Sequence, residues 1–149
     1  MNAKNLGGWL LRLALGGVLV YAAFPKLAEA HAFAGAIARY RLLPATFNQI
    51  LAVTLPWIEL AAGMLLVLRL WVRPAALLAA GLAVIFTLAV GSALARGLDI
   101  TCGCFGTEGG ARVGAWVLAL DLGLLAGAWV VYRLERETGP RKDLDEGKR

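Results

Sequence analysis

Charged residues are scarce in this chain of 149 amino acids. Aspartate, glutamate, lysine and arginine together make up 17% of it, whereas 60% is hydrophobic. Soluble globular domains carry about 25% charged and about 45–50% apolar residues. The mean hydropathy of +0.70 points the same way. This balance argues against a water-soluble fold.

Residues that bind metals are equally rare. The chain has two cysteines and one histidine, His31, whereas zinc usually takes four ligands. We therefore predict no metal site, although two thiolates would suit copper(I) and keep a copper-binding protein as an alternative. The sequence contains no phosphate-binding loop and no hydrolase signature. Its basic residues are spread over loops and tail, which favours anionic lipid over nucleic acid as their partner.

The main feature of the sequence is a set of long apolar runs. Four of them cover residues 6–24, 50–68, 75–95 and 113–132. Each is close to the roughly 20 residues with which a helix crosses a hydrocarbon layer about 30 Å thick. A membrane β-barrel would show short alternating segments instead. The sequence thus predicts an all-α polytopic membrane protein, with four transmembrane helices in an antiparallel bundle embedded in the lipid bilayer.

The domain organisation follows from the same pattern. Residues 1–132 form the membrane domain, and residues 133–149 are a charged cytoplasmic tail that we expect to begin as a short helical overhang and then to be disordered. The basic start of the chain and the segment 28–30 resemble parts of a signal peptide. The length of the first run and Arg12 within it favour a retained first span.

A further helix is expected over residues 27–41, after the first span. Its apolar residues recur at helical spacing, and Pro44 disfavours a helical residue just before it. The recurring residues are Leu27, Ala30, Phe33, Ile37 and Tyr40. The segment either lies in the membrane interface with its apolar face in lipid, where it could cover the cysteines, or packs on the bundle as a connector.

Basic residues indicate the orientation. Four crossings place both termini on one side of the membrane, and that side has more lysine and arginine than the other, which is typical of the cytoplasmic side. The richer side holds Lys4, Arg69, Arg73, Arg133, Arg136, Arg141, Lys142, Lys148 and Arg149, and the opposite side Lys26, Arg39, Arg41, Arg96 and Arg112. We expect a multi-pass protein of a bacterial inner membrane with cytoplasmic N- and C-termini.

Three charged residues fall inside the apolar runs. Arg12, Glu59 and Asp121 lie on three different predicted helices. A charge inside the membrane costs a few kcal/mol at least, so it normally faces the bundle interior and finds a partner. We predict an Arg12–Glu59 pair that extends to Asp121, either as a structural clasp or as a proton or quinone site. Lys26, near the outer end of its helix, is expected to snorkel toward the interface.

Small residues favour close packing of the helices. Gly123 and Gly127 form a GxxxG pattern in the fourth span, and Gly16, Gly17 and Gly63 allow close backbone approach elsewhere. The pattern is compatible with a bundle or with a homodimer.

Both cysteines are neighbours in the polar segment between the last two spans. Cys102 and Cys104 flank Gly103, which permits the bend that a disulfide between them needs. Such a tight ring is strained and therefore exchangeable. Arg96 and Arg112 would lower a thiol pKa, whereas Asp99 opposes this effect. Redox exchange by the two cysteines is our main hypothesis, and a structural disulfide in a non-catalytic scaffold is the alternative.

The cysteine count also limits the redox mechanism. The chain has no second cysteine pair on the other side of the membrane, so thiols alone cannot relay electrons across the bilayer. The pair would exchange with a dithiol protein on the outer face or pass electrons to a membrane quinone. We favour exchange with a protein and assign no cofactor, with a quinone as the alternative.

Several motifs together resemble the methylamine-utilisation MauE family, which belongs with the DoxX-like four-helix membrane proteins. They are Arg12, Pro25-Lys26-Leu27, Tyr40-Arg41-Leu42-Leu43-Pro44, Leu55-Pro56-Trp57-Ile58-Glu59, and Asp99 followed by Cys102-Gly103-Cys104-Phe105-Gly106. The resemblance runs from about residue 6 to 132. One departure is Leu120 before Asp121, where an arginine would be expected beside the acid.

This resemblance implies a function. It implies an inner-membrane protein that assists the maturation of a periplasmic, disulfide-rich protein, with a thioredoxin-like protein as partner. In the family that substrate is the small subunit of methylamine dehydrogenase. Our candidate site therefore consists of Cys102 and Cys104 as the redox residues, with Lys26, Arg96 and Asp99 as support near the outer face.

Overall fold

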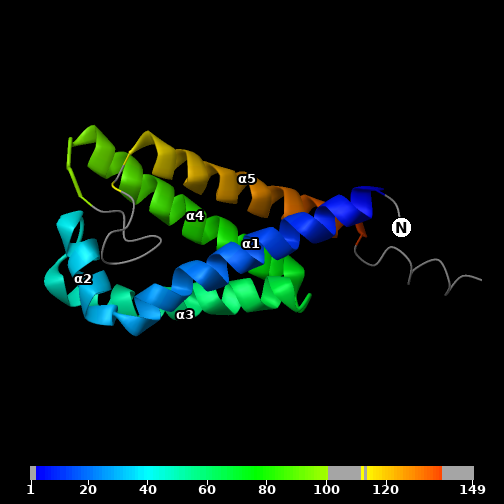
Figure 1. Ribbon diagram of the computed structural model, residues 1–149, viewed down its shortest axis with the longest axis horizontal. Coiled ribbons are helices and arrows are strands. Elements are labelled where there is room, and N and C mark those ends of the chain that lie inside the picture. Colours follow the sequence, from blue (N-terminus) through cyan, green and yellow to red (C-terminus); the bar gives the residue numbers. More distant parts are fainter. Residues whose placement is uncertain (1–2, 101–111, 113, 139–149) are drawn as a thin grey trace, which may run out of the picture.

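The computed structural model describes residues 3–100, 112 and 114–138, which form five helices and, within these residues, no strand. The helices are α1 (Ala3–Ala28), α2 (Ala30–Arg39), α3 (Ala45–Val67), α4 (Val72–Ala95) and α5 (Ala115–Thr138), arranged as in Figure 1. Four of them are long and apolar enough to cross a membrane. The prediction of an all-helical fold with four spans and a short helix after the first is confirmed.

The helices extend beyond the apolar runs that predicted them. α1 continues through Pro25 to Ala28, and α3 begins at Ala45, directly after Pro44 in an extended conformation. α5 continues into the charged tail as far as Thr138, and the rest of the tail lies outside the described residues. An apolar run measures the thickness of the hydrocarbon layer, whereas a helix can continue past it because its backbone hydrogen bonds do not depend on lipid.

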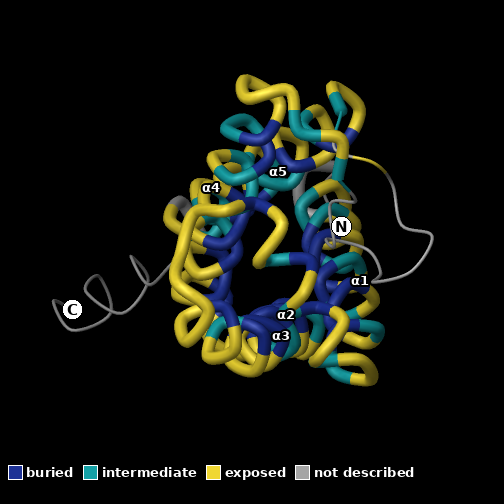
Figure 2. The backbone as a smooth tube through the Cα atoms, turned by 90° about the vertical axis from the view of Figure 1, so that its left-hand side faces the viewer, coloured by how far each residue is buried: buried dark blue, intermediate teal, exposed yellow. Residues whose placement is uncertain are grey.

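The bundle consists of two closely packed helix pairs. α1 packs along α3, and α4 packs along α5, while α3–α4 and α1–α5 contacts join the pairs. Seen along the long axis, buried residues face the interior and exposed residues cover the outside (Figure 2). The outside includes large apolar side chains such as Tyr21, Leu88 and Trp116, of which Trp116 is 73% exposed. Such a surface fits contact with lipid better than contact with water.

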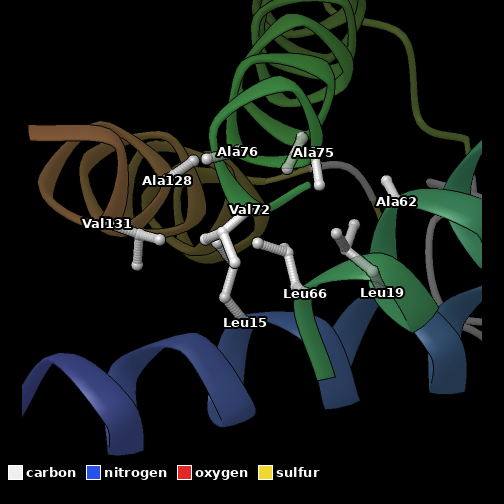
Figure 3. Packing of buried hydrophobic residues seen from close by; sticks show 10 residues of the cluster. Leu15, Leu19, Ala62, Leu66, Val72, Ala75, Ala76, Ala128 and Val131 are labelled. Atoms are coloured by element: carbon white, nitrogen blue, oxygen red, sulfur yellow. The ribbon is translucent and has the colours of Figure 1, made fainter. Parts of the chain in front are cut away.

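The half of the bundle near the α3–α4 turn has a dry core of small and aliphatic side chains (Figure 3). The core consists of Leu15, Leu19, Ala62, Leu66, Val72, Ala75, Ala76, Ala79, Ala128 and Val131. Here α1 and α3 cross so closely that a Cβ atom on Gly63 would lie 2.8 Å from the Gly16 carbonyl oxygen. Gly123, in contrast, has no neighbour within 4 Å of such a Cβ atom among the described residues. The crossing therefore depends on Gly16 and Gly63 and makes no use of Gly123.

The short helix α2 covers the opposite end of the bundle. Its Phe33 and Ala36 are 3% exposed and pack on α3 and α4. The apolar side of α2 thus contacts the bundle, as expected of a connector helix. Arg96, just after α4, donates a hydrogen bond to the backbone oxygen of Tyr40 and joins the end of α2 to the end of α4.

Candidate functional site

A buried ion pair joins α1 to α3. Lys26 Nζ lies 2.7 Å from both Oε1 and Oε2 of Glu59, and the two side chains are only 1% and 2% exposed. Side chains on a helix tilt toward its N-terminus. Because α1 and α3 are antiparallel, Lys26 tilts back along α1 toward the crossing, while Glu59 tilts away from it toward the level of Lys26. The two side chains therefore meet between the helices.

Two aromatic rings complete the surroundings of the ammonium group. Lys26 Nζ lies 5.4 Å from the ring centroid of Phe33 on α2 and 4.9 Å from that of Phe86 on α4. Ring faces attract a cation, and the attraction is strongest where water is excluded. The charge of Lys26 is thus stabilised by one carboxylate and by the faces of two rings.

A second carboxyl group faces the same space. Asp121 on α5 is 2% exposed, and its Oδ2 has no hydrogen-bond partner among the described residues. Asp121 lines a small cavity together with Lys26, Glu59 and Phe86. The cavity has about 20 Å³ of space for the centre of a water molecule, which is enough for one water. We call Lys26, Glu59 and Asp121 the charge cluster.

Tyr40, the residue that follows α2, is close enough to the charge cluster to be affected by Asp121. Tyr40 is 7% exposed. Burial, which disfavours the phenolate, and secondly the negative charge of Asp121 raise the pKa of Tyr40 to about 12. Tyr40 therefore keeps its O–H at physiological pH.

The predicted Arg12–Glu59 pair is wrong. Glu59 is bound by Lys26, and among the described residues Arg12 pairs with Glu135, with 3.9 Å between Arg12 Nη1 and Glu135 Oε1. Relative to the Gly16–Gly63 crossing, Arg12 and Glu59 lie about 12 Å apart along the bundle, at 1.5 Å per residue. Arg12 also tilts toward the start of α1, away from Glu59. The structure thus brings Glu59 and Asp121 together without Arg12.

Lys26 does not snorkel as we expected, because its side chain is 1% exposed. Sequence reasoning placed Lys26 at the outer face and missed it as a member of the charge cluster, along with Phe33 and Phe86. The signal that could have found Lys26 is the side-chain tilt of antiparallel helices, which brings residues 26 and 59 together once the crossing is known.

Asp99, expected to support the cysteines, pairs with a residue on the far side of the cysteine segment. Arg112 Nη1 lies 3.3 Å from Asp99 Oδ2, and both side chains are more than 70% exposed. An exposed pair of this kind contributes about 0–1 kcal/mol. Cys102 and Cys104 themselves lie outside the described residues, and no group of three or more potential metal ligands occurs within those residues.

Four membrane-spanning helices around a buried lysine–glutamate pair define a small polytopic membrane protein. The family model of the methylamine utilisation protein MauE matches residues 4–134. The chain therefore belongs to the MauE family.

Curated relatives carry the same name. The methylamine utilization protein MauE of Paracoccus denitrificans is 35% identical over 113 residues, which cover 75% of this chain and 60% of the relative. That of Methylophilus methylotrophus is 39% identical over 88 residues, or 58% of this chain and 46% of the relative. That of Methylorubrum extorquens is 37% identical over 89 residues, which cover 59% of this chain and 48% of the relative. The chain spans about half the length of the curated relatives it matches, and no solved structure matches it significantly.

Proposed function

We propose that this protein assists the maturation of a disulfide-containing periplasmic protein by thiol–disulfide exchange at Cys102 and Cys104. The observation that carries the proposal is the adjacency of the chain's only two cysteines in a membrane protein of the MauE family. In the sequence they lie between Asp99 and Arg112, and the side chains of Asp99 and Arg112 form an ion pair. The names of the relatives suggest that the substrate belongs to methylamine utilisation, with methylamine dehydrogenase as the first candidate.

The exchange would run through a mixed disulfide. The thiolate of one cysteine attacks a sulfur of the partner's disulfide and releases the partner's other sulfur as a thiolate. The second cysteine then displaces the bound partner sulfur, so this chain ends with a disulfide and the partner with two thiols. The reverse reaction passes through the same intermediate, and a thioredoxin-like periplasmic protein is the partner that suits this chemistry.

Trapping the intermediate tests the exchange. A Cys102→Ser or Cys104→Ser variant retains one thiol, so one of the two should accumulate a covalent adduct with the partner that reductant releases. The Cys102→Ser/Cys104→Ser variant is the matched control, and it should form none. Absence of an adduct from both single variants in cells that make the partner would refute exchange.

The orientation can be tested on the same residues. The excess of basic residues at the α3–α4 turn and in the tail supports cytoplasmic termini and an outward-facing cysteine segment in the bacterial inner membrane. A membrane-impermeant thiol reagent applied to intact cells should label the cysteines after reduction. Labelling only after lysis would show that the cysteine segment faces the cytoplasm and would contradict this orientation.

A non-catalytic scaffold is the second candidate, favoured by the buried ion pair that fixes α1 against α3. In that case a Cys102→Ser/Cys104→Ser variant would support growth on methylamine as well as the natural protein does. The proposed exchange predicts that this variant fails to support growth and yields little active methylamine dehydrogenase.

A further inference from the structure

The charge cluster contains more carboxyl groups than ammonium groups. Lys26 contacts both oxygens of Glu59, and Asp121 adds a second carboxyl group to the same cavity. We propose that the charge cluster is a proton-binding site inside the membrane domain, which holds one exchangeable proton on Asp121. This site is separate from the thiol chemistry and would exist whether or not the cysteines exchange.

The charge balance supports the proposal. With both carboxyl groups ionised, the cluster would carry one uncompensated negative charge in the interior of the bundle. An unpaired charge there costs several kcal/mol, whereas uptake of one proton removes it. Among the described residues, the cavity wall offers no second cation, because its lining apart from the charge cluster is apolar, as with Leu82 and Phe86 of α4.

The contacts indicate which carboxyl group takes the proton. Both oxygens of Glu59 lie 2.7 Å from Lys26 Nζ, so Glu59 is held as the carboxylate of the ion pair. Asp121 Oδ2 has no partner among the described residues and faces a cavity with room for one water. A protonated Asp121 could donate its O–H to that water, which would satisfy the group that the protein leaves unpaired.

The dry core beside the charge cluster limits how the proton reaches it. The apolar core of Leu15, Leu19, Leu66 and their neighbours fills the bundle between the cluster and the Arg12 end. Tyr40 lies on the opposite side, close enough to Asp121 to respond to its charge. The proton would therefore enter from the end of the bundle that α2 covers.

Infrared spectroscopy of the full chain in lipid nanodiscs tests the site. At neutral pH we expect a C=O stretching band of a protonated carboxyl group, which shifts in D₂O. Asp121→Asn should abolish the band, whereas Glu135→Gln, which changes a carboxyl group at the other end of the bundle, should leave it. A natural protein without the band, or a band that survives in Asp121→Asn, would overturn the proposal.

The number of bands should follow the balance of charges in each variant. Glu59→Gln leaves Lys26 free to pair with Asp121, so the band should be lost. Lys26→Met removes the ammonium group, so a second band should appear. The double variant Lys26→Met/Glu59→Gln removes one charge of each sign and should keep one band, which preserves the test even if Lys26→Met does not fold. A different number of bands in any of these variants would contradict the proposed balance of charges.

Two further measurements distinguish a proton site from a sodium site and from the thiol chemistry. If the cavity bound a sodium ion in place of a proton, the band would appear in choline buffer and vanish on addition of sodium chloride, which would overturn the proposal. The Cys102→Ser/Cys104→Ser variant should keep the band. The failure of thiol exchange and the failure of the proton site are therefore distinguishable.

Discussion

Arg12 and Lys26 are two buried cations on the same helix, yet their surroundings differ. Lys26 Nζ lies 2.7 Å from both oxygens of Glu59 and faces the aromatic rings of Phe33 and Phe86. Arg12 is 4% exposed, but within the described part of the chain its ion-pair partner is Glu135, 3.9 Å away and 28% exposed, and its Nε has no partner there. One cation belongs to a closed pair and the other to a loose pair.

The difference shows that helix direction selects the partners of charges inside this bundle. Both cations tilt toward the start of α1. For Lys26 this direction leads to the middle of the bundle, where Glu59 lies on the antiparallel α3. For Arg12 it leads to the bundle end, where the partly exposed Glu135 of α5 lies. Removing a partner from the closed pair should therefore cost far more than removing one from the loose pair.

Lys26→Met should have the largest effect. It leaves Glu59 buried without its cation, and loss of one partner from a buried pair typically costs about 3–5 kcal/mol. The measurement is the free energy of unfolding in detergent micelles or bicelles. The control is Lys26→Met/Glu59→Gln, which removes both members of the pair and should regain most of the loss. A double variant no more stable than Lys26→Met would mean that packing of the lysine stem, and not its charge, is what matters.

Gly63→Ala should come next, because it separates α1 and α3 at the crossing between the two cations. An added Cβ atom would lie 2.8 Å from the Gly16 carbonyl oxygen, so the helices must shift apart. Overpacking of this kind costs about 1–3 kcal/mol. Gly81→Ala on α4 is the matched control, since its Cβ atom would meet nothing within 4 Å among the described residues. Equal stability of the two variants would contradict the close crossing.

Arg12→Gln should cost less, about 1 kcal/mol, because its pair with Glu135 is long and partly exposed. Glutamine keeps a polar group near Glu135 while removing the charge. The same unfolding measurement applies, with Lys26→Met beside it. A loss as large as that of Lys26→Met would mean that the two pairs are equivalent.

Most of the fold could be predicted from the sequence because the apolar runs report the thickness of the membrane directly. The exact ends of the helices could not, because an apolar run does not report how far a helix continues past the hydrocarbon layer: α1 ends at Ala28 and α3 begins at Ala45. Of the charge cluster, Glu59 and Asp121 were identified by the cost of a charge inside a span. Their partner Lys26 was missed, because choosing between Arg12 and Lys26 requires the position of the helix crossing. The roles of Cys102 and Cys104 stay predictions, since both lie outside the described residues.

Glu135→Gln should have the smallest effect on stability. The dependence of this effect on salt distinguishes the loose pair from the closed pair. Glu135 is 28% exposed, so ions can reach the pair with Arg12, and we expect a loss of a few tenths of a kcal/mol at low salt. At about 1 M salt the Debye length falls to about 3 Å, so the natural protein and the variant should become equally stable. The loss caused by Lys26→Met should persist at the same salt concentration, because ions do not enter a site whose side chains are 1% and 2% exposed. Unfolding measured at both salt concentrations checks this, and a salt-sensitive Lys26→Met loss would show that the closed pair is open to solvent.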